Sequence, residues 1–155
     1  MRLLTPILLL LAGAGLPQSP VSFCDLVRNP EKYSGQEVTV RATYRYGFEW
    51  SELYCLDCVE KSKARSGKAW LQIPVDLDDD SARSLKRMPR HSGIVNLTVH
   101  GVFMSGETYG HLNGYRYQIV AHKIGDVAVI QKGMKSPAVE EKAEKRWGCG
   151  GANPK

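Results

Sequence analysis

Four cysteines are the residues of this 155-residue chain with the most specific chemistry. Cys55 and Cys58 have the CxxC spacing found in structural disulfides, thiol-exchange proteins and zinc sites. The strand–helix alternation of thiol-exchange folds is missing around this motif, and no proline follows Cys58. We therefore predict a structural disulfide between Cys55 and Cys58. A bond from Cys24 to either of them is the alternative.

A zinc site is the second interpretation of these cysteines. Zinc needs three or four convergent ligands, and the fold would have to bring Cys24, Cys55, Cys58 and His111 together to supply them. The sequence has no second CxxC and no histidine pair at ligand spacing. We predict no cofactor, with zinc as the alternative. Cys149, in a glycine-rich stretch, is either an unpaired thiol or a remote disulfide partner.

Aromatic side chains form a second candidate site. Most of the tyrosines alternate along expected strands, which predicts rings in the core and hydroxyl groups at its rim. Other aromatic residues fall in the expected loops 47–68 and 106–114, where they are free to stack on a ligand. The predicted ligand-contacting residues are Trp50, Tyr54, Tyr109 and His111.

The remaining histidines are isolated in the sequence, and we interpret them as surface or strand residues. They are His91, His100 and His122. No nucleophile elbow, phosphate-binding loop or positioned pair of carboxylates is present in the sequence. We therefore predict that the protein is not an enzyme.

Alternating hydrophobicity predicts the strands that position these residues. Residues 38–46 alternate between apolar and polar side chains after a turn at Gly35, and residues 94–105 and 115–124 alternate again, with 127–130 as an extension. Gly101, in mid-strand, predicts a bulge or sharp bend. A short apolar strand is expected at 69–73, while 47–68 is expected to be a loop.

Two short helices complete the predicted domain. Ser22 is a suitable N-cap for a helix of about two turns, with Asp25 three residues later. A second helix is expected over 81–88, after an acidic run that suits the positive end of a helix dipole. Long alternating strands, a mid-strand glycine and few helices together predict a mainly β domain built on a small curved sheet.

The chain divides into a leader, a linker, one domain and a tail. Residues 1–14 have a charged start, an apolar run and an Ala12-Gly13-Ala14 ending, the pattern of a secretory signal peptide. An uncleaved leader is the alternative and would be the only membrane contact. We expect a linker over 15–21, the domain over 22–130 and a charged, mostly disordered tail over 131–155. The predicted location is secreted or periplasmic.

The net charge of +5 comes largely from the two ends of the chain. Outside Arg2 and the tail, residues 15–130 contain 14 basic and 13 acidic side chains, a balance of +1. Binding to nucleic acid usually needs a broad basic surface. The near-neutral domain therefore argues against a nucleic-acid partner.

The pattern of the predicted domain resembles a small family of secreted bacterial OB-fold proteins of uncharacterised function. The matching residues are Tyr33, Gly35, Val38 and Val40, then Leu97, Val99, Gly101 and Phe103, then Tyr109-Gly110-His111 before Tyr115. The resemblance covers roughly residues 22–126. It implies a five-stranded, partly open OB-like barrel with a short N-terminal helix and one inserted helix.

We therefore expect an exported, non-catalytic OB-fold module that binds an unknown protein or small ligand through its loops. Two alternatives remain open. One is a metal-binding or thiol-redox protein that uses the CxxC motif. The other is a module that binds single-stranded nucleic acid or an oligosaccharide.

Overall fold

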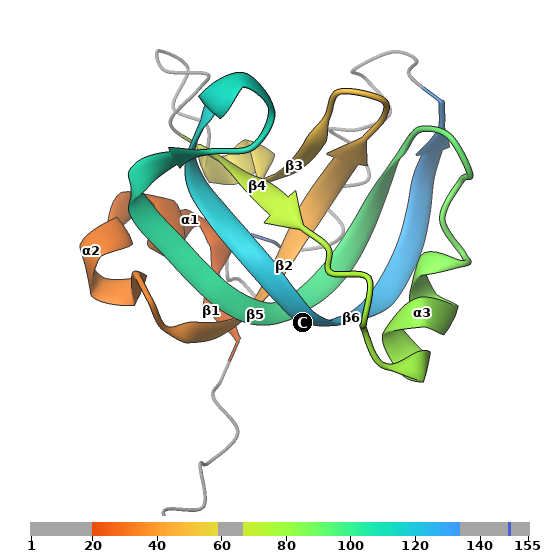
Figure 1. The fold of residues 1–155 in the computed structure, drawn as a ribbon, viewed down its shortest axis with the longest axis horizontal. Helices are drawn as coiled ribbons and strands as arrows, with labels where there is room; N and C mark the ends of the chain where they lie inside the picture. The colour runs from red at the N-terminus through yellow and green to blue at the C-terminus, as the bar shows by residue number, and fades with distance from the viewer. Residues whose placement is uncertain (1–19, 59–66, 134–148, 150–155) are drawn as a thin grey trace, which may run out of the picture.

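The computed structural model describes residues 20–58, 67–133 and Cys149 (Figure 1). The predicted signal peptide, most of the predicted linker and nearly all of the predicted tail lie outside the described residues. The predicted domain is described except for residues 59–66 of its expected first loop.

The described chain is mainly β, as predicted, and its strands have these bounds: β1 (Val21–Ser22), β2 (Glu37–Tyr46), β3 (Ser51–Tyr54), β4 (Lys68–Gln72), β5 (Gly93–Tyr109) and β6 (Tyr115–Lys132). The helices are α1 (Phe23–Arg28), α2 (Pro30–Tyr33) and α3 (Asp79–Leu85), with 3-10 turns η1 (Leu56–Cys58) and η2 (His111–Asn113).

The strands pair in a closed ring in the order β2, β3, β4, β6, β5 and back to β2, while β1 pairs with Val40 and Arg41 of β2. The β4–β6 and β1–β2 pairs are parallel, and the other pairs are antiparallel. The described residues form six strands, five in the ring and β1 outside it, so the predicted count of five is wrong. The strands β1 and β3 were not predicted, because strands of two and four residues are too short for an alternating pattern to stand out.

The predicted alternation is confirmed by burial. Residues that were expected on one face fill the interior of the ring, and their neighbours face outward. The core residues contributed by β2, β5 and β6 include Val38, Val40, Ala42, Tyr44, Val95, Leu97, Val99, Phe103, Tyr117, Ile119 and Ala121.

Gly101 lies at a β-bulge, as its position in the sequence predicted. His100 is opposite Lys123, but Gly101 is opposite Ala121, so His122 is an extra residue between the two pairs. A Cβ atom on Gly101 would lie 2.1 Å from the carbonyl oxygen of Val120, which is backbone and has little freedom to move. Only glycine permits this close approach of β5 to β6.

The described residues form three helices, whereas two were predicted: α2 was not expected, and the bounds of the other two differ from the predicted ones by a few residues. Ser22 caps α1 as predicted, because its hydroxyl accepts a hydrogen bond from the Asp25 N–H at 3.3 Å. The helix α3 begins earlier than expected, because the Asp78 carboxylate accepts the Ser81 N–H at 2.7 Å and makes Asp78 the N-cap. It packs beside β6 (Figure 1), where the Ser81 hydroxyl accepts the Ile124 N–H at 2.9 Å. In the described part of the chain, no helix has the length and apolar character needed to span a membrane.

Candidate functional site

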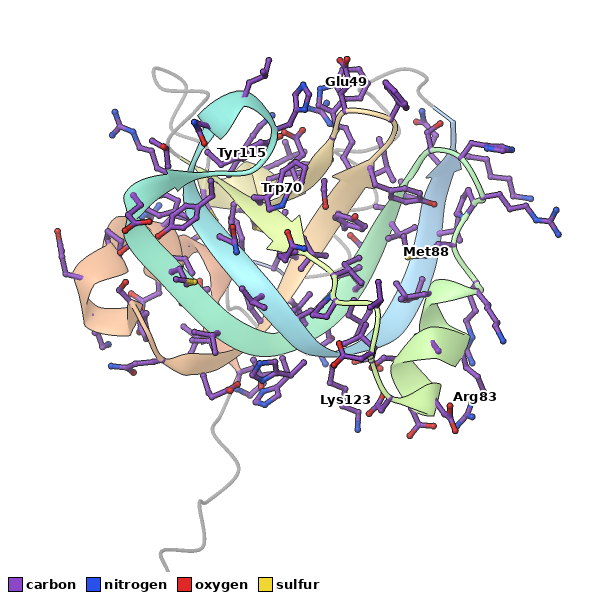
Figure 2. All side chains as sticks on the ribbon, viewed as in Figure 1. Glu49, Trp70, Arg83, Met88, Tyr115 and Lys123 are labelled. Atoms are coloured by element: carbon purple, nitrogen blue, oxygen red, sulfur yellow. A yellow bond between two sulfur atoms is a disulfide. The ribbon has the colours of Figure 1, made fainter. Side chains whose placement is uncertain are left out.

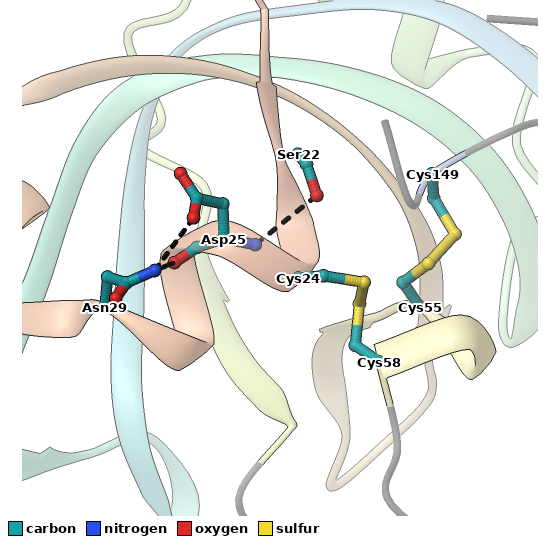
Figure 3. The surroundings of a disulfide bond; sticks show 7 residues. All are labelled: Ser22, Cys24, Asp25, Asn29, Cys55, Cys58 and Cys149. Atoms are coloured by element: carbon teal, nitrogen blue, oxygen red, sulfur yellow. Dashed lines mark hydrogen bonds between the residues drawn. A yellow bond between two sulfur atoms is a disulfide. The ribbon is translucent and has the colours of Figure 1, made fainter. Parts of the chain in front are cut away.

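All four cysteines form disulfides, but the pairing differs from the first prediction (Figure 3). Cys24 bonds to Cys58, and Cys55 bonds to Cys149. The predicted Cys55–Cys58 bond is therefore wrong, while the alternative that gave Cys24 a partner in the CxxC motif is confirmed. Cys149 is the remote partner that the sequence left open.

Tertiary packing explains why neighbours in the sequence do not pair. The CxxC motif forms the turn η1, in which the Cys58 N–H donates to the Cys55 carbonyl oxygen at 3.0 Å. The motif packs against α1, which places Cys24 beside Cys58 with a Cα–Cα distance of 4.9 Å. The sulfur atoms of Cys24, Cys55 and Cys58 all lie within 4.8 Å of one another. The CxxC spacing alone brings the sulfurs of Cys55 and Cys58 close together. Because the fold places the Cys24 sulfur near them as well, the packing of α1 decides which pair bonds.

The alternative zinc site stays a prediction. Disulfide sulfurs are not the thiolates that bind zinc, so metal binding would need reduction first. His111 is not part of the sulfur group formed by described residues. It lies instead in η2, in the turn between β5 and β6.

Three of the four predicted ligand-contacting residues lie in or beside turns. Trp50 is in the turn between β2 and β3 and is 44% exposed. Tyr109 ends β5, and the exposed His111 follows it. Tyr54 does not lie in a loop as predicted, because it belongs to β3 and is only 3% exposed.

Trp70 is a candidate residue that was not predicted from the sequence. Its ring lies 5.3 Å from the Tyr115 ring, centroid to centroid, at an interplanar angle of 56° (Figure 2). Gly110 covers the Trp70 ring so closely that a Cβ atom there would lie 2.5 Å from it. The alternation along β4 could have indicated that Trp70 faces outward. Ala69 and Leu71 are buried, whereas the residues between and beside them, Lys68, Trp70 and Gln72, point to the opposite face.

Glu52 is the centre of a polar network beside Trp70. Its side chain is 4% exposed and forms ion pairs with Arg45 and with Lys68, whose Nζ lies 3.1 Å from Oε1. The Tyr115 hydroxyl donates to Glu52 Oε2 at 3.1 Å. Burial, together with the negative charge of Glu52, raises the pKa of Tyr115 to about 12. The network thus joins β2, β3, β4 and the start of β6.

Strand register explains how these side chains meet. Glu52 is directly opposite both Arg45 and Trp70, so the three form a cross-strand row on the outer face of the sheet. In the next row Tyr54 is opposite Lys68. Among the described residues, the Tyr54 hydroxyl and Arg45 Nε are buried without a hydrogen-bond partner. Buried polar atoms are normally paired, so these two atoms are exceptions to that rule within the sheet.

Two turns with exposed apolar side chains flank this surface. Phe48 and Trp50 are in the turn between β2 and β3, and Leu112, which is 86% exposed, is in the turn between β5 and β6. Both turns lie along the upper edge of the view in Figure 1. We call the surface the Trp70 face, and define it by Arg45, Glu52, Lys68, Trp70 and Tyr115 with the turns 47–50 and 110–114.

Comparison with family models, curated proteins and solved structures finds no match for this chain.

Proposed function

We propose that this protein is an exported, non-catalytic OB-like module that binds a ligand on the Trp70 face. The strand ring supports the OB-like assignment: it has five strands, and α3 is inserted between β4 and β5. OB folds bind ligands on their second and third strands and on the loops 1–2 and 4–5. Counted from β2, these are β3, β4 and the turns 47–50 and 110–114.

The observation that carries this proposal is the Trp70–Tyr115 pair beside the buried Glu52 network. An aromatic ring gives a flat apolar surface, and the partly exposed side chains of Arg45 and Lys68 give hydrogen-bond donors at its edge. Such a combination suits a ligand with a flat face and a polar edge, such as a sugar ring or a nucleobase. The near-neutral charge of the domain favours an oligosaccharide over nucleic acid.

The disulfides are compatible with an oxidising compartment outside the cytosol. Export itself belongs to the proposal, because the predicted signal peptide lies outside the described residues. An N-terminal analysis of protein recovered from the medium or periplasm of an expressing cell tests it. Cleavage after Ala14 is expected, whereas protein retained in the cytosol would contradict export.

Binding can be tested with two defined probes, a hexasaccharide of β-1,4-linked N-acetylglucosamine and a thymidylate dodecamer. We expect the sugar to shift amide NMR signals of the Trp70 face and to bind at least tenfold more weakly to Trp70→Ala. Val75→Ala is the control, because Val75 is fully exposed outside this face. Trp70→Phe keeps an aromatic ring and should retain most of the binding.

The outcomes separate the possible ligands. Shifts with the dodecamer that disappear as salt is added would keep the face but replace the sugar with nucleic acid. Shifts outside the Trp70 face, or equal binding by Trp70→Ala, would contradict the proposed site. The absence of saturable binding to either probe would contradict the ligand class.

Thiol or zinc chemistry is a second candidate function, favoured by the three sulfur atoms within 4.8 Å of one another. Thiol titration of the unfolded, unreduced protein and a metal analysis distinguish the candidates. No free thiol and no metal would support a structural role for the cysteines. Reactive thiols or one zinc ion per chain would support the second candidate.

A further inference from the structure

His100, His122 and Glu37 meet on the outer face of β2, β5 and β6, although the histidines are isolated in the sequence. His100 Nε2 lies 3.3 Å from Glu37 Oε2, and His122 Nδ1 lies 2.9 Å from Glu37 Oε1. We propose that these three residues, the His–Glu cluster, form a binding site for a divalent transition-metal ion of the zinc class. This site is separate from the Trp70 face and does not depend on it.

The bulge at Gly101 positions the second histidine. Because His122 is the extra residue between the His100–Lys123 and Gly101–Ala121 pairs, its side chain joins that of His100 on the outer face. The two imidazole rings are 6.4 Å apart, centroid to centroid, and edge-on to each other. Bulges commonly re-aim a side chain in this way.

Glu37 reaches the same point from β2. Thr39, two residues further along that strand, is directly opposite His100. The side chain of Glu37 therefore approaches His100 along the outer face and contacts both rings. Two imidazole nitrogens and a carboxylate oxygen are ligands that zinc accepts, with water as a fourth ligand in open sites.

Thr39 orients the first histidine. Its hydroxyl lies 3.0 Å from His100 Nδ1, which directs His100 Nε2 towards Glu37. Histidine ligands of metals are typically held in this manner, by a hydrogen bond to the nitrogen that does not bind the metal. Thr39 is thus a positioning residue for the proposed site.

The cluster is accessible, and its side chains must rotate before they can close on an ion, because their ligand atoms do not all lie within 4.8 Å of one another. The side chains of His100, His122 and Glu37 are 45%, 50% and 46% exposed. Two imidazoles on one tetrahedral zinc ion, with Zn–N bonds of ~2.0–2.1 Å, have ring centroids about 5 Å apart. Rotation of two half-exposed side chains can supply the difference from 6.4 Å. Lys123 is directly opposite His100 in the strand register, and its positive charge opposes the binding of a cation.

The test is calorimetric titration of the full mature chain, disulfides intact, with Zn²⁺, followed by amide and imidazole NMR with substoichiometric Cu²⁺. We expect one saturable zinc site per chain and paramagnetic broadening that centres on His100, His122 and Glu37. His100→Gln and His122→Gln should each weaken zinc binding at least tenfold. Thr39→Val should weaken it less, because it removes an orienting contact and no ligand.

His91→Gln is the matched control, since His91 is exposed and outside the cluster. Its zinc affinity should equal that of the parent chain, and thermal unfolding of every variant checks that the fold is kept. Equal binding by the His100 and His122 variants would overturn the proposal. Broadening centred elsewhere, or no saturable zinc binding, would also overturn it.

Discussion

Cys55 is bonded to Cys149 across 94 residues of sequence, and this bond ties the end of β3 to the C-terminal part of the chain. Cys149 is itself 2% exposed and belongs to the hydrophobic core. Its carbonyl oxygen accepts the Phe23 N–H at 3.4 Å, so it also contacts the start of α1. A residue from the last part of the sequence thus completes packing between the first helix and the CxxC turn.

Removing this bond should destabilise the protein substantially. For the double variant Cys55→Ser/Cys149→Ser we expect a loss of about 2–5 kcal/mol in the free energy of unfolding, because the bond closes a long loop in the unfolded chain. The control is Cys24→Ser/Cys58→Ser, which opens a loop of only 34 residues and should cost about 1 kcal/mol less. Urea unfolding measures both, and a larger loss in the control would contradict this account.

The connectivity can be tested by peptide mapping without reduction. Trypsin leaves Cys55 and Cys58 on one peptide, which should be linked to both the Cys24 and the Cys149 peptides. A protease that cuts before Asp57 then separates the two cysteines of the motif and identifies each partner. A bond confined to the Cys55–Cys58 peptide would restore the pairing first predicted from the sequence.

Local patterns in the sequence explain why the strands could be predicted and the cysteine pairing could not. Burial alternates with a period of two along a strand, so Val38 and Val40 indicate the inner face without knowledge of any partner. Disulfide partners depend on which elements pack together. Cys24 lies beside Cys58 because α1 packs against η1, and the spacing of cysteines in the sequence does not reveal that contact.

The same distinction applies to the candidate sites. Trp70 was overlooked because its strand is short and apolar, although its phase places it on the outer face opposite Glu52. His100 and His122 were correctly interpreted as strand residues, but not as neighbours, because the register of β5 and β6 brings them together. Gly101 predicted the bulge, yet the sequence does not say which side chain a bulge re-aims.

The buried carboxylate of Glu52 should contribute measurably to stability. Glu52→Gln removes the charge that faces Arg45 and Lys68, and we expect a loss of about 1–3 kcal/mol, because hydrogen bonds to buried charged groups are among the stronger ones. The matched control is Asp80→Asn, since the Asp80–Arg83 pair is 65% exposed on both sides and should contribute less than about 1 kcal/mol. Similar losses for the two variants in urea unfolding would contradict a special role for Glu52.

Two tyrosines should titrate late. The pKa of Tyr115 is raised to about 12 by burial and by the charge of Glu52, and that of Tyr46 is raised to about 12 by burial and by Tyr44. The ordinary value is 10.0, so the folded state holds these hydroxyls neutral longer than the unfolded state does. Their contribution to stability is therefore complete below pH 10 and is lost as the pH rises from about 10 to 12.

Near-ultraviolet absorbance follows the formation of tyrosinate and checks this assignment. Tyr115→Phe should remove one late-titrating group. Glu52→Gln should lower the pKa of Tyr115, because the repulsion between the carboxylate and the tyrosinate is gone, and should leave the pKa of Tyr46 unchanged. If Glu52→Gln lowers the pKa of both Tyr115 and Tyr46, the cause is a general loosening of the fold, and the local effect of the Glu52 charge is contradicted.

Gly101→Ala tests the bulge that positions His122. The added Cβ would lie 2.1 Å from the Val120 carbonyl oxygen and 2.9 Å from the Ala121 Cα, both in the backbone of β6. We expect a loss of about 1–3 kcal/mol or more, because the strands must separate or change register. Gly125→Ala is the control within β6, since its Cβ would have no neighbour within 4 Å.

The same two variants test the placement of His122 through zinc binding. If the Gly101→Ala variant is folded, its zinc affinity should fall, while the Gly125→Ala variant should keep the affinity of the parent chain. Unchanged stability and unchanged zinc binding in Gly101→Ala would show that neither the close approach nor the placement of His122 depends on this glycine.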